Sequence, residues 1–115
     1  MTADEIYLAL GQSIVDVIDE PWKEAVMIIK RVNKAAKFEG EYITEDGRKE
    51  GLNMWEYNFD SSMIHRLHEI ITSDGISRWN KLMFKILPTG KFELDFIWDQ
   101  EYQDEIDQLN NETQQ

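Results

Sequence analysis

The 115 residues fit one domain, and the absence of cysteine excludes disulfides, thiolate catalysis and cysteine-ligated zinc. Apolar residues make up 42% of the chain and aromatic residues 11%, so a wholly disordered chain is excluded. With 12 Lys and Arg against 23 Asp and Glu, the formal net charge is −11. That charge argues against nucleic acid or an anionic membrane as the primary partner and allows a basic protein.

The N-terminal segment predicts a helix and carries no targeting signal. Thr2 and Glu5 form a capping-box pattern, and the apolar residues behind them recur at helical spacing. This predicts a helix over about residues 4–19, which Pro21 ends. The acidic start has no basic signal-peptide region, and the apolar runs fall short of the ~20 residues that a membrane helix needs. We therefore expect a cytoplasmic protein without a membrane span.

Three strands are predicted next. Residues 25–32 are apolar on both faces at one end, which indicates a strand covered on both sides there. Residues 35–44 alternate between apolar and charged side chains, which predicts a half-buried strand. The Asp-Gly pair at 46–47 predicts a turn, and the alternation over 52–59 predicts a third strand. That third strand would place its three aromatic side chains on one face: Trp55, Tyr57 and Phe59.

A second helix and a β-hairpin complete the predicted sheet. Asp60 or Ser61 caps the helix, which an Asp-Gly pair at 74–75 ends. Its apolar stripe consists of Met63, Ile64, Leu67, Ile70 and Ile71. Two alternating runs, 82–87 and 92–98, flank a Pro-Thr-Gly-Lys turn and predict a hairpin with one buried and one largely acidic face. We expect Trp98 to be the last buried residue of that hairpin.

The order of elements indicates an α+β domain over residues 1–109. We expect an antiparallel sheet in the order α-β-β-β-α-β-β, with two main helices on one face. A weak apolar stripe predicts a short polar C-terminal helix or tail, and residues 110–115 should fray.

Residues that could carry catalysis are few. His65 and His68 lie three positions apart beside Glu69, a spacing that could share a metal ion. Both histidines lie off the apolar stripe, so we interpret them as surface residues and expect no metal site. The chain has no Gly-x-Ser-x-Gly elbow, and its glycines do not space as a phosphate loop. We therefore expect no enzyme activity and no cofactor.

The distribution of charge points to a protein partner. After Lys91 the chain has no Lys or Arg, while it has eight acidic residues with Trp98 and Tyr102 among them. An acidic surface with aromatic anchors can dock a basic protein, because charge steers the encounter and aromatic residues supply desolvated contacts. The candidate partner-binding residues are Glu93, Asp95, Asp99, Glu101, Tyr102, Asp104 and Glu105.

The hairpin sequence from Leu82 to Asp99 resembles the YezG-like antitoxins, also called EsaG-like immunity proteins, of bacterial polymorphic toxin systems. The shared features are a turn glycine, a basic residue and then alternating aromatic and acidic residues, GKFELDFIWD. The opening amphipathic helix and the tryptophan at position 22 also fit. The resemblance implies a small acidic cytoplasmic protein that binds and neutralises the toxic C-terminal domain, often a nuclease, of a cognate secreted toxin.

Two alternatives to an immunity protein stay open at this stage. One is an adaptor or secretion-chaperone-like module that binds a partner without inhibiting it, and the other is a metal-dependent enzyme built on the two histidines. A homodimer is also open, because an unprotected sheet edge is a common route to association. The sequence names neither the toxin nor the surface that binds it.

Overall fold

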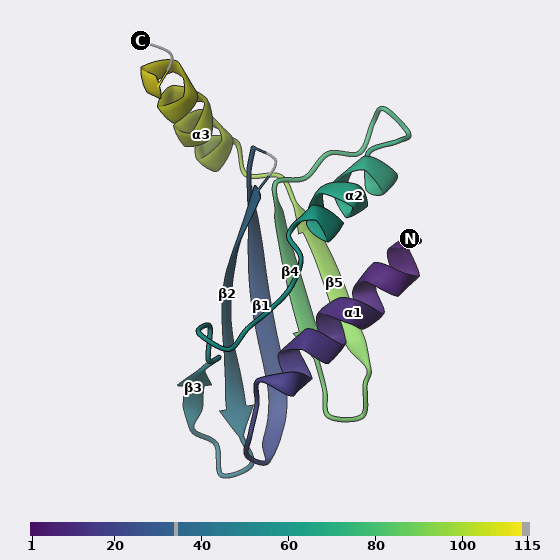
Figure 1. The fold of residues 1–115 in the computed structure, drawn as a ribbon, viewed down its shortest axis with the longest axis vertical. Helices are drawn as coiled ribbons and strands as arrows, with labels where there is room; N and C mark the ends of the chain where they lie inside the picture. The colour runs from purple at the N-terminus through teal and green to yellow at the C-terminus, as the bar shows by residue number, and fades with distance from the viewer. Residues whose placement is uncertain (34, 114–115) are drawn as a thin grey trace.

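The protein is described by a computed structural model that covers residues 1–33 and 35–113 (Figure 1). Within these ranges the chain forms three helices and one five-stranded antiparallel sheet, which confirms the predicted α+β class. The elements are α1 (Ala3–Asp16), β1 (Trp22–Val32), β2 (Ala35–Thr44), β3 (Lys49–Gly51), α2 (Ser62–Ile71), β4 (Lys81–Ile86), β5 (Phe92–Ile97) and α3 (Gln100–Thr113).

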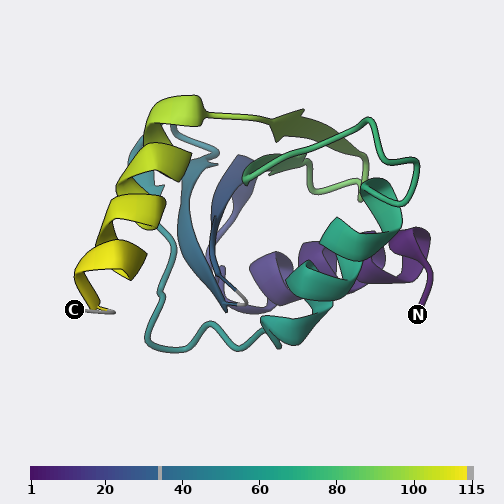
Figure 2. The same ribbon diagram turned by 90° about the horizontal axis from the view of Figure 1, so that it is seen from above.

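The sheet has a helix-covered face and an open face. Its strand order is β3-β2-β1-β4-β5, so β5 and the short β3 are the edges. Helices α1 and α2 lie together on one face, as predicted (Figures 1 and 2). Helix α3 leaves the end of β5 and runs past the β1–β2 hairpin, on the side away from α1 and α2 (Figure 2). Much of that second face is therefore left uncovered by the described helices.

The core lies between the covered face and the two helices. Every second residue of β1 and β4 points into it, as the alternation predicts. The apolar stripe of α1 packs against these strands, and α2 contributes Ile64 and Leu67. The largest fully buried side chains include Trp79, Phe84, Ile6, Leu10, Ile14, Met27, Ile29 and Leu82.

Helix α1 begins as predicted and ends earlier. The Thr2 hydroxyl accepts a hydrogen bond from the Glu5 amide at 3.2 Å, and the Glu5 carboxylate accepts one from the Thr2 amide at 3.1 Å. The predicted end near residue 19 is wrong, because the helix stops at Asp16. Strand β1 already starts at Trp22, so residues 17–21 are needed to turn the chain into the sheet.

The predicted strand over 52–59 is also wrong. Strand β3 spans only Lys49–Gly51, and the following residues form turns. Asn53 stabilises these turns, because its side chain accepts from the Trp55 amide at 3.2 Å and its carbonyl accepts from the Tyr57 amide at 3.1 Å. Tyr57 and Phe59 pack on the ring of Phe38, whereas Trp55 is 100% exposed. The three aromatic residues therefore do not share a face.

The remaining predictions concern the second helix and the C-terminus. Asp60 supplies the cap of α2, since its carboxylate accepts from the Ser62 amide at 2.9 Å, and the side chain of Ser61 makes no cap bond. Helix α3 includes residues 110–113, which we predicted to fray. The side chain of Asn110 exchanges hydrogen bonds with that of Asn33 at 2.9 and 3.2 Å, which ties this end of α3 to the β1–β2 hairpin. Residues 114–115 lie outside the described residues.

Candidate functional site

The open face of the sheet has an apolar centre with acidic sides. Val26, Ile28 and Met83 lie next to one another in the register of β1 and β4. Glu39 and Glu41 of β2 flank them on one side, and together these residues line a shallow hollow of about 400 Å³. Exposed apolar residues rimmed by polar ones are typical of protein-binding surfaces.

Several lysines on and around this face are engaged by carboxylates. Lys30 pairs with Glu39 at 3.4 Å, Lys49 with Glu41 at 3.4 Å and Lys85 with Glu24 at 3.1 Å. These positive charges are therefore largely neutralised within the chain itself. Lys37, which lies opposite Lys30 in the β1–β2 register, is exposed and forms no ion pair in the described ranges, so one cation remains on this face beside the unpaired carboxylates.

Glu93 and Asp95, which we name the acidic edge pair, lie on the open face of the edge strand β5. Both side chains are exposed. Glu93 lies opposite Lys85 in the β4–β5 register, but the Lys85 ammonium turns to Glu24. Neither residue of the pair forms an ion pair within residues 1–33 and 35–113. The pair thus presents two uncompensated charges to an approaching partner.

Asp99 and Tyr102 form a joint between the sheet and α3. The Asp99 carboxylate accepts from the Lys81 ammonium at 2.6 Å and from the Tyr102 amide at 3.0 Å. These two bonds, Lys81 first, hold the pKa of the Asp99 carboxyl below its usual range. The Tyr102 hydroxyl donates to the Arg31 carbonyl at 2.8 Å, and burial raises the pKa of this tyrosine. Both candidate residues are therefore held by contacts inside the chain.

Asn80 stabilises this joint through hydrogen bonds. Its side chain is 1% exposed and accepts from the Asp99 amide at 2.9 Å while it donates to the Asp99 carbonyl at 2.8 Å. Its own carbonyl accepts from the Arg31 amide at 2.9 Å. The side chain and the main chain of this one buried residue thus link β1, the end of β5 and the start of α3. The position of α3 relative to the sheet depends on this link.

The other acidic candidates lie on α3. Glu101, Asp104 and Glu105 are exposed, and Asp104 accepts from the Gln100 side-chain amide at 2.8 Å. In the part of the chain that the structure describes, none of the three pairs with a lysine or arginine. The predicted set therefore separates into the acidic edge pair on β5 and an acidic group on α3, with the Asp99–Tyr102 joint between them.

Trp98 occupies the boundary between hairpin and joint. It is only partly buried, which differs from the full burial expected for the end of the hairpin's inner face. Its ring is covered by the Arg78 guanidinium, 4.3 Å from the ring centroid, and its indole nitrogen donates to Gln100 at 3.1 Å. Among the four tryptophans, Trp79 is the one that is fully buried.

The histidines of α2 have separate environments. The His65 imidazole lies 3.1 Å from the Glu69 carboxylate, whereas the His68 ring packs against Trp79 with centroids 5.3 Å apart. Burial, followed by the nearby Arg31 charge, lowers the pKa of His68. The prediction that both histidines are surface residues is wrong, because both are half-buried and the His68 ring lies against the buried Trp79. Among the described residues, no group of three side chains is placed to hold a metal ion.

Sequence reasoning missed an apolar groove between α1 and the β4–β5 hairpin. It has a volume of about 160 Å³. Leu8 is 67% exposed and Phe92 is 38% exposed at its sides, and Gly11 forms part of its floor. The available signal was the pair Leu8 and Val15, two apolar residues seven positions apart and outside the main stripe of α1.

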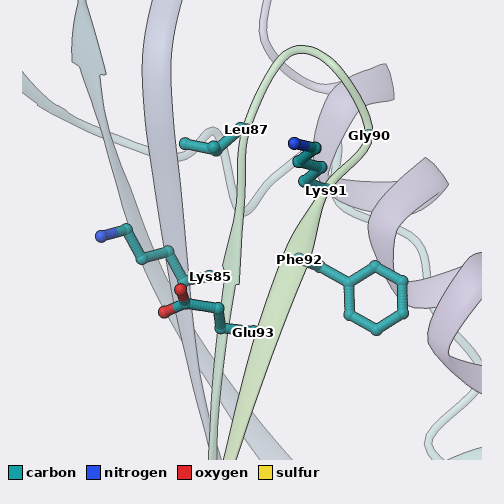
Figure 3. A pocket seen from close by; sticks show the side chains of 6 residues that line it. All are labelled: Lys85, Leu87, Gly90, Lys91, Phe92 and Glu93. Carbon is teal, nitrogen blue, oxygen red and sulfur yellow. The ribbon is translucent and has the colours of Figure 1, made fainter.

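A second hollow, of about 390 Å³, lies at the tip of the same hairpin (Figure 3). Lys85 and Glu93 point to one side of the hairpin, and Phe92 points to the other side, toward the helices (Figure 3). Lys91 adds another charge beside the turn glycine. Because the lining carries charges of both signs, it does not favour one class of charged ligand.

No protein-family model and no curated protein matched the chain. Each helix in the described ranges is too short or too polar to cross a membrane.

Proposed function

We propose that this protein is an immunity protein, or antitoxin, which binds the toxic C-terminal domain of a cognate secreted toxin and neutralises it. The action is stoichiometric binding, with no turnover and no cofactor. The observation that carries the proposal is the acidic edge pair, Glu93 and Asp95, exposed without cationic partners beside an apolar sheet face. The hairpin's resemblance to YezG-like antitoxins supports the same function.

The chemistry of the partner follows from the charge. A nuclease domain lines its substrate cleft with Lys and Arg to bind phosphates. A protein of net charge −11 is attracted to such a cleft over several ångströms, and apolar contacts then hold the complex. Val26, Ile28 and Met83 are the apolar residues available for that contact on the open face. The partner proposed is therefore a basic toxin domain, most simply a nuclease.

Co-expression tests this function. The chain is produced together with the toxin-like open reading frame adjacent to its gene, and growth and co-purification are measured. We expect restored growth and a stable complex. A folded toxin domain that neither binds nor loses toxicity would refute the proposal. A complex in which the toxin stays active would instead assign the chain to the non-inhibitory adaptors.

Charge reversal tests the surface separately. Glu93→Lys, Asp95→Lys and Glu101→Lys together should slow association severalfold at low salt, because the steering charge is reversed. Asp99 is left unchanged, since it holds the joint with Lys81. Stopped-flow association rates give the measurement, and circular dichroism checks the fold. Equal rates for the folded variant and the parent would remove the acidic surface from the proposal but leave the immunity role.

A further inference from the structure

Strand β5 presents a free backbone edge. It is the last strand in the order β3-β2-β1-β4-β5 and runs over six residues, Phe92–Ile97. The Leu87 amide donates to the Lys91 carbonyl at 2.9 Å, which makes these two residues a hydrogen-bonded pair. Because such pairs alternate along an antiparallel ladder, Glu93 and Asp95 bond toward β4. The amides of Phe92, Leu94 and Phe96 then point away from the sheet.

This edge lacks most of the features that stop a sheet from being extended. Natural edge strands are interrupted by proline or bulges, or carry charged side chains, lysine above all. Residues 92–97 contain neither proline nor lysine, and the β4–β5 register runs without a bulge from Ile86–Phe92 to Lys81–Ile97. Its only charges are the two carboxylates of the acidic edge pair. The edge is thus regular enough to accept another strand.

The two sides of this edge differ in chemistry. On the open face lie Glu93 and Asp95, both without an ion pair in the described ranges. On the helix side lie Phe92, 38% exposed, and the apolar groove beside Leu8. A strand added next to β5 would direct alternate side chains to these two sides. The side chains that fit are positively charged toward the acidic edge pair and apolar toward the groove.

A second copy of the chain fits this edge poorly. A symmetric antiparallel pairing of two β5 strands keeps the open faces of both copies on the same side. Centred on Leu94, it would place Glu93 directly opposite Asp95 of the other copy, twice. Like charges directly opposite each other destabilise a strand pair. The charge on the edge therefore favours a basic strand over self-association.

We propose that β5 is a docking edge that receives an extended segment of the basic partner, with Lys or Arg at every second position and apolar residues between. The segment hydrogen-bonds to the outward amides of β5, its cations face Glu93 and Asp95, and its apolar side chains enter the groove beside α1. This inference rests on the proposed function, since the segment belongs to the partner that is neutralised. It assigns recognition to backbone pairing as well as to charge.

The test uses synthetic peptides and the full chain. The probe is a capped heptapeptide, Lys-Val-Lys-Ile-Lys-Val-Lys, and the control peptide has the same composition with its four lysines grouped at one end. Binding is measured by fluorescence polarisation and backbone protection by amide hydrogen exchange. We expect the alternating peptide to bind severalfold more tightly and to slow exchange at Leu94 and Phe96. A version N-methylated at alternate positions should lose most of this binding.

Protein variants separate edge charge from total charge. Glu93→Gln with Asp95→Asn should weaken the alternating peptide severalfold, whereas Glu45→Gln with Glu56→Gln, the same charge change at two exposed residues outside the candidate set, should leave it within twofold. Absent binding, equal binding of the two peptides, protection on α3 instead of β5, or a peptide-free dimer that protects β5 would each overturn the inference. Growth rescue by co-expression is scored independently, so these results do not decide the immunity role.

Discussion

Replacing Asn80 by alanine should weaken the whole fold by loosening the joint that holds α3. The side chain is 1% exposed and forms two hydrogen bonds with the Asp99 backbone, at 2.9 and 2.8 Å. A third contact, to the Gln103 side chain, is longer at 3.5 Å. Alanine leaves the Asp99 amide and carbonyl without these partners in a partly buried position.

The magnitude follows from those two bonds. A hydrogen bond between neutral groups contributes about 1 kcal/mol net, and leaving a buried partner unsatisfied costs about 1–3 kcal/mol. Because the Asp99 side chain is 33% exposed, water can reach part of the joint. We therefore expect Asn80→Ala to lower the free energy of unfolding by about 2–3 kcal/mol. With a urea m-value of about 1.5 kcal/mol/M, the midpoint falls by about 1.3–2 M.

Two measurements check this prediction. Urea unfolding followed by tryptophan fluorescence gives the midpoint, and amide hydrogen exchange compares α3 with α1. The matched control is Asn58→Ala, an exposed asparagine whose removal should change stability by less than about 0.5 kcal/mol. A loss below about 1 kcal/mol for Asn80→Ala would refute the reasoning. So would an equal acceleration of exchange in both helices, because the joint would then not position α3.

Two further perturbations test the core and the pH dependence. A Cβ on Gly40 would clash with the buried Leu52 side chain, so Gly40→Ala should destabilise the fold by about 1–3 kcal/mol. A urea double-mutant cycle with Leu52→Ala should recover part of that loss, and strict additivity would contradict the clash. Burial lowers the pKa of His68 from its usual value of 6.5, so the unfolded chain binds a proton at this residue more readily than the folded chain does. The stability that is present above the usual pKa is therefore lost as the pH falls through the lowered pKa of the folded chain. Urea midpoints at about pH 7 and about pH 5 should therefore differ less in His68→Gln than in the parent, and equal differences would contradict this role.

Local sequence patterns predicted the hairpin because its strands and its turn depend on residues that lie close together in the sequence. The alternation in β4 and β5 is produced by direct neighbours, and the turn glycine at position 90 has the positive φ, 92°, that such a turn requires. The segment after β3 shows the opposite case. Its alternating aromatic residues imitate a strand, but Asn53 turns the chain and Tyr57 packs on Phe38, a contact set by tertiary structure. The spacing of apolar residues alone does not distinguish a strand from a turn segment whose aromatic side chains pack on a distant residue.

The identity of the edge strand also depends on distant residues. β1 pairs with β4 through residues that lie between 51 and 61 positions apart, and that pairing leaves β5 at the end of the sheet. A contact 18 positions away also decides which carboxylate is engaged and which are free. Asp99 looks like its acidic neighbours in sequence, yet Lys81 engages it from the start of β4. The sequence therefore predicted an acidic surface. It could not show which carboxylates stabilise the fold and which are free to bind a partner.

The position of the free carboxylates on an edge strand is the feature that bears on partner binding. A net negative charge keeps a protein dispersed wherever its carboxylates lie, so charge alone does not require them on a regular edge strand. On β5, Glu93 and Asp95 oppose pairing with a second copy because like charges would face each other across the new ladder. They attract a basic strand at the same place, because its positive side chains would face these two carboxylates. If β5 is the docking edge, two carboxylates both prevent self-association and select the partner, and neutralising them should weaken partner binding while it promotes dimers.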